Sequence, residues 1–219
     1  MPGSLADRLA SLHRRIAHAA AAARRDPKSV TLVAVSKTVS TESIREAYDL
    51  GLRDFGESRL QEALPKIEQL PSDTRWHFIG HLQSNKARRV AQSFRILHSV
   101  ENERQLDEIE KQPASVEAFV QVNLAGEAQK SGLSPQTLDN FLSYAANCHR
   151  VRIAGLMTIN PADSSDEEAR MLFRKLADMA KERGLNGLSM GMSSDFETAI
   201  ACGATHVRVG SLLFGDRNS

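Results

Sequence analysis

One lysine is placed where an amine could do chemistry. The apolar residues 33–35 are followed directly by Ser36 and Lys37. A lysine at the end of a buried strand loses hydration, so its pKa is expected to fall and its neutral amine becomes available for attack on a carbonyl group. The alternative is a lysine that extends its charged end from a strand terminus into solvent. This segment alone leaves both interpretations open.

Residues 189–195, with the sequence SMGMSSD, could bind an anion. Small residues leave backbone N–H groups accessible, Ser193 and Ser194 add hydroxyls, and a helical pattern follows. A helix that begins with free N–H donors is suited to a phosphate group. The alternative is an ordinary N-cap, in which Ser194 or Asp195 binds the first turn of the helix.

Residues 207–211, with the sequence VRVGS, form a second candidate of this kind. Gly210 permits close approach to the backbone, and Ser211 adds a hydroxyl. Arg208 contributes a fixed positive charge with planar donors. The alternative is a structural arginine paired with a carboxylate in the core.

The elements that position these residues are short β-branched runs separated by helical patterns. Helices are expected over 41–50, 59–69, 134–146, 166–183 and 196–202. Alternation of this kind is typical of βα units and a parallel sheet. The expected strands are 31–36, 53–55, 76–79, 96–99, 117–122, 152–157, 188–190 and 206–209.

Eight strands with eight crossovers predict an α/β fold, a single (β/α)8 TIM-type barrel. We expect one domain over 1–219, with the barrel in 30–219 and an extra N-terminal helix in 1–29. The competing fold is an open doubly wound sheet, which would have a glycine-rich dinucleotide turn, and no G-x-G-x-x-G occurs. Residues 4–25 are amphipathic, which favours a helix capping the barrel over a targeting segment.

Barrel topology brings the three segments together. Phosphate sites of such barrels are often formed by the loops after strands seven and eight, and strand one adjoins strand eight when the sheet closes. The amine of Lys37 and the anion site would therefore lie side by side at the barrel mouth. A ligand that carries both an aldehyde and a phosphate would satisfy both.

Composition excludes several classes of function. The chain has 28 basic and 27 acidic residues and a formal charge of +1, which argues against a nucleic-acid partner. No apolar run is long enough to span a bilayer, so we expect no membrane association. The two cysteines form neither a metal motif nor a disulfide framework, which fits the cytoplasm.

Motifs along almost the whole chain resemble the pyridoxal phosphate homeostasis protein family, a single-domain relative of the alanine racemase N-terminal barrel. The resemblance implies a fold like that of type III pyridoxal 5′-phosphate (PLP) enzymes. The segments that carry it are LVAVSKTVS (32–40), FGESRLQEA (55–63), WHFIGHLQSNK (76–86), QVNLAGEAQKSG (121–132), GLMTIN (155–160), LSMGMSSDFETAI (188–200) and GATHVRVGSLLFG (203–215).

The resemblance also implies roles for single residues. Lys37 is expected to hold PLP as a Schiff base, and Arg208 is expected to face the pyridine nitrogen. The family often has asparagine where this chain has Ser58, so that a hydroxyl replaces an amide. Met157 is a further candidate contact. The residues expected to cradle the phosphate are Ser193, Ser194, Gly210 and Ser211.

The function implied is a PLP-binding protein of vitamin B6 homeostasis that works without turnover, as a monomer, and delivers PLP to apo-enzymes. Racemisation needs acid–base groups on both faces of the substrate, and Tyr48 and Tyr144 lie in helical patterns away from the strand ends. An arginine at the ring nitrogen also disfavours protonation and weakens the ring as an electron sink. The alternatives are a small PLP-dependent amino-acid racemase and a regulatory module with PLP as its ligand.

Two further clusters have structural interpretations. His77 and His81 flank the end of the third expected strand, where a metal pair is conceivable, but no other ligand is near in sequence. A structural or ligand-lining role at the barrel mouth is favoured. Lys86, Arg88 and Arg89 could touch RNA, but a solvated helix face is the favoured interpretation.

Overall fold

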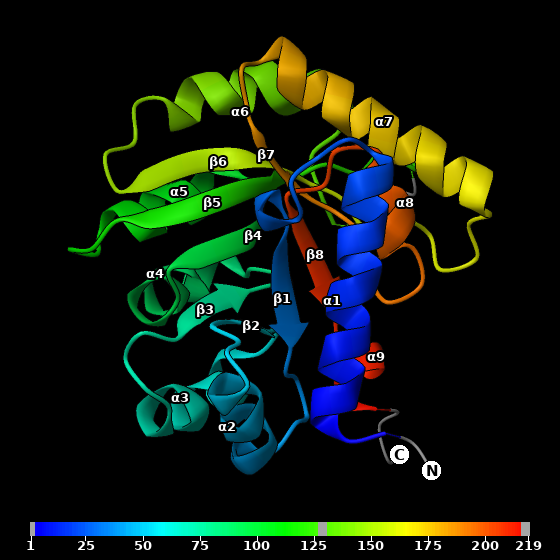
Figure 1. The fold of residues 1–219 in the computed structure, drawn as a ribbon. Helices are drawn as coiled ribbons and strands as arrows, with labels where there is room; N and C mark the ends of the chain where they lie inside the picture. Colours follow the sequence, from blue (N-terminus) through cyan, green and yellow to red (C-terminus); the bar gives the residue numbers. More distant parts are fainter. Residues whose placement is uncertain (1–2, 127–130, 216–219) are drawn as a thin grey trace.

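The computed structural model describes residues 3–126 and 131–215, and its centre is a closed barrel of parallel strands (Figure 1). Each strand pairs with the next along the chain, and β8 closes the barrel by pairing with β1. The predicted barrel is thus confirmed. Its strands are β1 Thr31–Val35, β2 Asp54–Glu57, β3 Arg75–Phe78, β4 Ile96–Val100, β5 Val116–Gln121, β6 Val151–Met157, β7 Gly187–Ser189 and β8 His206–Val209.

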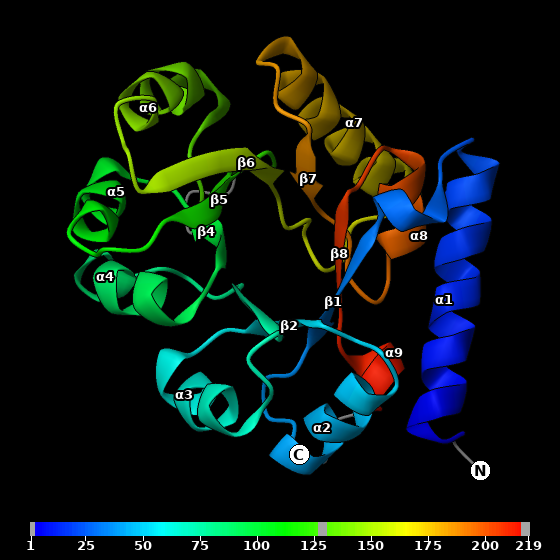
Figure 2. The ribbon, with the colours of Figure 1, turned by 60° about the vertical axis from the view of Figure 1, so that its left-hand side comes forward.

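Helices connect the strands and surround the barrel (Figure 2). Gly51 and Gly184, with φ of 101° and 66°, follow the ends of α2 and α7, where a helix commonly ends on a glycine in the left-handed conformation. The helices are α1 Leu5–Ala22, α2 Thr41–Asp49, α3 Leu60–Gln69, α4 Ser84–Ser93, α5 Glu103–Glu110, α6 Leu138–Ala145, α7 Asp166–Glu182, α8 Phe196–Ala201 and α9 Ser211–Phe214, with short 3₁₀ turns η1 Pro27–Ser29 and η2 Pro135–Thr137.

The N-terminal helix α1 does not cap an end of the barrel, contrary to the sequence-based expectation. It runs along the outside and packs against α8 and α9 (Figures 1 and 2). The helix that follows β8 is α9, which has only four residues and covers little of the sheet. Helix α1 therefore takes the position of the eighth outer helix, and it buries the side chains of Leu5, Leu9, Leu12, Ile16 and Ala20 there.

The strand β2 extends beyond the expected 53–55, to Glu57. Glycine is generally unfavourable in a strand, so the sequence pattern gives little sign that the strand continues through Gly56. In the barrel, a Cβ on Gly56 would lie 3.0 Å from Val33 Cγ1 and 3.1 Å from Ile79 Cδ1. Gly56 is therefore part of the strand because the crowded interior favours a small residue there.

The interior of the barrel differs from its outer core. Between strands and helices the buried side chains are apolar, as with Ile44, Phe55 and Leu97. Barrel interiors are usually filled by branched apolar residues. Here the buried interior includes polar side chains from several strands, among them His77 and His98. No helix in the described part of the chain is both long and apolar enough to cross a membrane.

Candidate functional site

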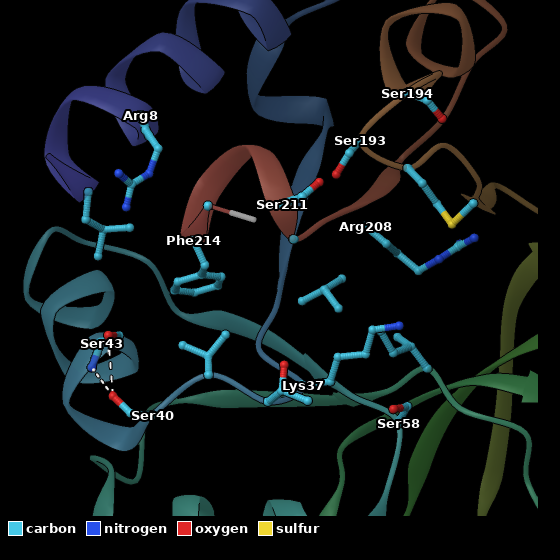
Figure 3. Close-up of a pocket in the computed structure, with 18 of the residues that line it drawn as sticks. Arg8, Lys37, Ser40, Ser43, Ser58, Ser193, Ser194, Arg208, Ser211 and Phe214 are labelled. Atoms are coloured by element: carbon cyan, nitrogen blue, oxygen red, sulfur yellow. Dashed lines mark hydrogen bonds between the residues drawn. The ribbon is translucent and has the colours of Figure 1, made fainter. Parts of the chain in front are cut away.

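A cavity of about 760 Å³ opens beyond the carboxyl ends of β1, β2, β7 and β8. Figure 3 shows Ser193, Ser194 and Ser211 on one side of it, Lys37 and Ser58 on the other, and Arg208 between the two groups. The sequence-predicted residues that line this cavity are Lys37, Ser58, Ser193, Ser194, Arg208, Gly210 and Ser211.

Lys37 is held in place by the turn that follows β1. The N–H of Val39 donates to the carbonyl of Ser36 at 3.0 Å, and Thr38 between them has φ of 64°. A left-handed backbone at a β-branched residue is strained, and such strain is found at functional sites. The conformation of this turn directs the residue after Ser36 toward the cavity rather than onward along the sheet.

A buried ion pair fixes the same turn from behind. Lys66 Nζ donates to the carbonyl of Ser36 and to Glu57 Oε1, both at 2.8 Å. Ser36 Oγ donates to the same carboxylate oxygen at 2.7 Å. Lys66 and Glu57 come from α3 and β2, so this pair ties two further elements to the end of β1. The pair keeps Lys66 away from the cavity, and Lys37 is the lysine that lines it among the described residues.

The amine of Lys37 has no partner within the described residues. Its side chain is half-buried, and its Nζ forms neither a hydrogen bond nor an ion pair there. An unpaired amine beside a cavity is free to react with a carbonyl group. The alternative of a lysine extended into solvent is less consistent with its place on the lining.

The loop after β7 is built by hydrogen bonds that do not involve the hydroxyls of its serines within the described residues. Asp195 Oδ1 accepts from the N–H of Met192 at 2.7 Å, and the carbonyl of Met192 accepts from the N–H groups of Asp195 and Phe196. Asp195 occupies the N-cap position of α8 but makes no side-chain bond to that helix. The simple N-cap interpretation is therefore wrong. In the described chain, the hydroxyls of Ser193 and Ser194 have no hydrogen-bond partner.

The turn after β8 completes the polar lining. Ser211 is the first residue of α9, and its hydroxyl likewise has no partner among the described residues. A Cβ on Gly210 would lie 3.3 Å from both Cβ and the carbonyl oxygen of Val35. Glycine thus keeps the β8 turn close to β1, where Lys37 begins its turn. Three free hydroxyls and an amine suit a ligand with a phosphate and a carbonyl.

Arg208 is buried and forms no carboxylate pair within the residues that the structure covers. Its Nη1 donates to Ser189 Oγ at 2.5 Å and its Nη2 to the carbonyl of Thr158 at 3.0 Å. Burial lowers the pKa of its guanidinium to about 10, and the charge of Asp195 opposes this effect. The expected alternative, a core arginine bonded to a carboxylate, is wrong. Arg208 remains charged at neutral pH and faces the cavity.

Two of the candidate contacts differ in their exposure to the cavity. Ser58 follows β2 directly, and its hydroxyl lies on the lining without a hydrogen-bond partner in the described chain. Met157, the last residue of β6, is buried and is not on the lining. The lining residues that the sequence did not reveal include Arg8, Thr38, Ile79 and Phe214. Arg8 and Phe214 were not recognisable because they come from helices at opposite ends of the chain.

The two histidines of the third strand have separate environments. His77 lies inside the barrel, and its Nε2 is 3.0 Å from Asp54 Oδ1. His81 is exposed at the mouth, with its Nδ1 3.3 Å from Glu101 Oε1. Among the described residues no group of three or more histidine, cysteine or acidic side chains could hold a metal ion. Lys86, Arg88 and Arg89 lie on the exposed face of α4, as expected for a solvated helix.

The alanine racemase N-terminal domain family matches residues 8–218 of the chain. A pyridoxal phosphate homeostasis protein of Synechocystis is 44% identical over 206 residues, covering 87% of this chain and 93% of the relative. One from Pseudomonas aeruginosa is 42% identical over 222 residues, covering 98% and 96%.

Solved structures of similar proteins have the same fold as this chain. PipY of Synechococcus elongatus is 38% identical in sequence over 97% of this chain and 100% of PipY, with a TM-score of 0.87 without PLP and 0.85 with PLP bound. Alanine racemase from Corynebacterium glutamicum shares the fold at 18% identity and a TM-score of 0.70, covering 97% of this chain and 62% of the racemase. The chain belongs to the pyridoxal phosphate homeostasis protein family, within the wider family of alanine racemase N-terminal domains.

Proposed function

We propose that this protein binds PLP in the barrel-mouth cavity and takes part in PLP homeostasis. The observation that carries the proposal is the combination, on one cavity, of an unpaired lysine amine and three serine hydroxyls without partners in the described chain. The names of its relatives and the PLP-bound form of PipY support it.

The lining residues fit the chemical groups of the cofactor. Lys37 would hold the aldehyde as a Schiff base, and Arg208 would face the pyridine nitrogen. Ser58 would offer a hydroxyl to the ring, and Met157, which is buried behind the lining, would support it by packing. Once bound, PLP supplies a conjugated ring that can accept electrons. The phosphate would lie among Ser193, Ser194, Gly210 and Ser211.

The protein would hold PLP without catalytic turnover. Racemisation needs a second acid–base group on the face of the substrate opposite the lysine. Tyr48 on α2 donates to Asp73 at 2.6 Å, and Tyr144 on α6 donates to Asp107 at 2.6 Å. Both tyrosines are on outer helices, and no tyrosine is on the lining formed by the described residues. A buried, charged arginine at the ring nitrogen would also weaken the ring as an electron sink.

We also propose that residues 1–219 act as a single PLP-binding domain, as a monomer in the cytoplasm. A Schiff base is exchangeable, and a cavity open at the barrel mouth would allow PLP to leave for an apo-enzyme. Single-turnover mixing of loaded protein with an apo-enzyme tests this step. Transfer faster than from an equal concentration of free PLP supports delivery, and transfer no faster than that excludes it.

Binding is tested by titrating PLP into purified protein and recording the absorption spectrum. We expect a visible band from the Schiff base in the wild type, and its loss in Lys37→Ala. Lys86→Ala is the matched control, because Lys86 is exposed on α4 and should retain the band. An undiminished band in Lys37→Ala would overturn the proposed role of that lysine.

The racemase alternative has its own test. Purified loaded protein is incubated with single enantiomers of a panel of amino acids, and the product is separated on a chiral column. We expect no accumulation of the opposite enantiomer beyond one equivalent per protein. Sustained turnover that disappears in Lys37→Ala would replace the holding role with catalysis.

A further inference from the structure

A continuous series of hydrogen bonds crosses the interior of the barrel and ends at the cavity. We call it the interior relay. Its members come from five different strands, and all are buried. In order they are Asp54 on β2, His77 on β3, His98 on β4, Ser189 on β7 and Arg208 on β8.

The distances along the interior relay are those of direct hydrogen bonds. Asp54 Oδ1 is 3.0 Å from His77 Nε2, and His77 Nδ1 is 2.9 Å from His98 Nε2. His98 Nδ1 is 2.6 Å from Ser189 Oγ, which is 2.5 Å from Arg208 Nη1. Buried polar groups are costly unless they are bonded, and here each ring nitrogen has one partner. If these positions served stability alone, apolar residues would fill the interior at a lower cost in desolvation free energy.

The charge at the far end fixes the direction of these bonds. Burial alone would raise the pKa of Asp54, but hydrogen bonds from His77 and Arg75 lower it to about 2. Asp54 is therefore an ionised carboxylate that can only accept, so the proton of His77 is on Nε2. The single negative charge is already paired with Arg75, whose Nε is 2.7 Å from Asp54 Oδ1. A cationic His77, which is fully buried, would have to share this one negative charge with Arg75, so the relay is drawn with a neutral His77 ring.

The donor and acceptor of each remaining hydrogen bond follow from the protonation of His77. With its proton on Nε2, neutral His77 accepts at Nδ1, so His98 donates from its own Nε2. Burial lowers the pKa of His98 well below its ordinary value, so this ring is neutral too. His98 then accepts at Nδ1 from the hydroxyl of Ser189, and the Ser189 oxygen accepts from Arg208. Every bond donates toward Asp54.

We propose that the interior relay positions Arg208 at the cavity. Ser189 is the positioning residue: because its hydroxyl hydrogen is donated to His98, its oxygen is available to accept from Arg208. This rests on the proposed function, in which Arg208 faces the ring of PLP. Two nitrogens of the Arg208 guanidinium donate to Ser189 Oγ and to the carbonyl of Thr158. Held in this way, the guanidinium lies on the lining of the cavity. If the relay ran the other way, Ser189 Oγ would accept from both His98 and Arg208, and its own hydrogen would have no acceptor among the described residues.

The relay has titratable neighbours on other strands. His206 of β8 lies beside it, with its ring centre 6.1 Å from that of His77 and 5.9 Å from that of His98. Burial lowers the pKa of His206 to about 4, so it adds no charge beside the relay at neutral pH. Arg75 at the far end and Arg208 at the cavity end are the cations that face it.

The first test needs no cofactor. Nitrogen NMR of protein labelled at histidine reports which ring nitrogen carries the proton. We expect neutral His77 and His98 with the proton on Nε2 in both rings at neutral pH. A proton on Nδ1 of either ring, or a charged ring, would overturn the proposed direction even if PLP binds as proposed.

The second test measures ligand affinity in Ser189→Ala. This change leaves a buried N–H of Arg208 without its acceptor, so we expect the Kd for PLP to rise about tenfold. The Kd for pyridoxal, which has no phosphate, should rise by the same factor, because the ring contact is affected. Ser99→Ala is the control: Ser99 is buried on β4 and donates to the carbonyl of Gly80, outside the relay.

The spectrum of bound PLP gives a readout that general destabilisation would not change. A loosened Arg208 opposes ring protonation less, so the spectral transition with pH should move to higher pH in Ser189→Ala. If the wild type binds PLP and Ser189→Ala matches it in affinity and spectrum, the relay proposal fails alone. If the wild type does not bind PLP, the proposed function fails, and the NMR result still decides the direction of the relay.

Discussion

At the scale of single residues, the site separates groups that are engaged from groups that are free. Lys66 on α3 donates to Glu57 and to the carbonyl of Ser36, whereas Lys37, the residue after Ser36, has no partner in the described chain. Asp195 accepts from the N–H of Met192, whereas the hydroxyl of Ser193 in the same loop has no partner among the residues that the structure describes. The engaged residues build the turns, and the free ones are left to bind.

This division predicts a phosphate-specific effect. Ser193→Ala and Ser211→Ala should each raise the Kd for PLP about tenfold, because a hydrogen bond to a charged group is lost. The Kd for pyridoxal should stay unchanged, because that molecule has no phosphate. Isothermal titration or fluorescence quenching with both ligands measures the ratio.

Ser43→Ala provides the matched comparison for these serines. Ser43 lines the same cavity from α2, away from the serines of the β7 and β8 loops (Figure 3). Its removal should alter neither Kd. An equal loss of PLP and pyridoxal affinity in the Ser193 and Ser211 variants would show that they do not contact the phosphate.

The candidate site could be predicted from sequence where its residues are adjacent in the chain, as in 193–194 and 208–211. The interior relay could not, because its residues come from five strands and meet only when the barrel closes. A usable signal was nonetheless present. Asp54, His77 and His98 each stand next to a buried apolar residue of the same strand, so the alternation of the strand turns their side chains to the opposite face, inward.

At the scale of elements, the strands were largely predictable and the helix positions less so. All eight expected strands form, because β-branched runs separated by helical patterns leave few alternatives. The errors have particular causes. Gly56 appeared to end β2, and α9 is too short to give a helical period. The packing of α1 could not be foreseen because it compensates for the small size of α9.

The position of α1 predicts that its apolar face contributes to stability. Leu12 is 2% exposed, and Leu12→Ala should lower the free energy of unfolding by about 2–4 kcal/mol. Urea denaturation followed by circular dichroism measures this loss. Arg14→Ala is the control, because Arg14 is exposed on the same helix and should change stability by about 0.5 kcal/mol at most. A detachable targeting segment would instead tolerate both changes equally.

At the scale of the whole molecule, the polar interior links folding to pH. Burial lowers the pKa of His206 from 6.5 to about 4 and lowers that of His98 well below its ordinary value. Between pH 6.5 and about 4, these two histidines are increasingly protonated in the unfolded chain but remain neutral in the folded barrel. The free energy of unfolding should therefore fall as pH drops below about 6.5, by up to about 1.4 kcal/mol per pH unit for each histidine.

His206→Gln isolates one part of this dependence. Its free energy of unfolding between pH 6.5 and 4 should have a slope shallower by up to about 1.4 kcal/mol per pH unit. His149→Gln should keep the slope of the wild type, because His149 is exposed. Equal slopes in the wild type and in His206→Gln would mean that this histidine is not held neutral by burial.

The proposed function depends on a covalent bond at one position. Protein saturated with PLP is reduced with borohydride, digested, and mapped by tandem mass spectrometry. We predict a single pyridoxyl adduct on Lys37, in stoichiometric amount. An adduct on another lysine in place of Lys37, or no adduct at saturation, would contradict the central claim.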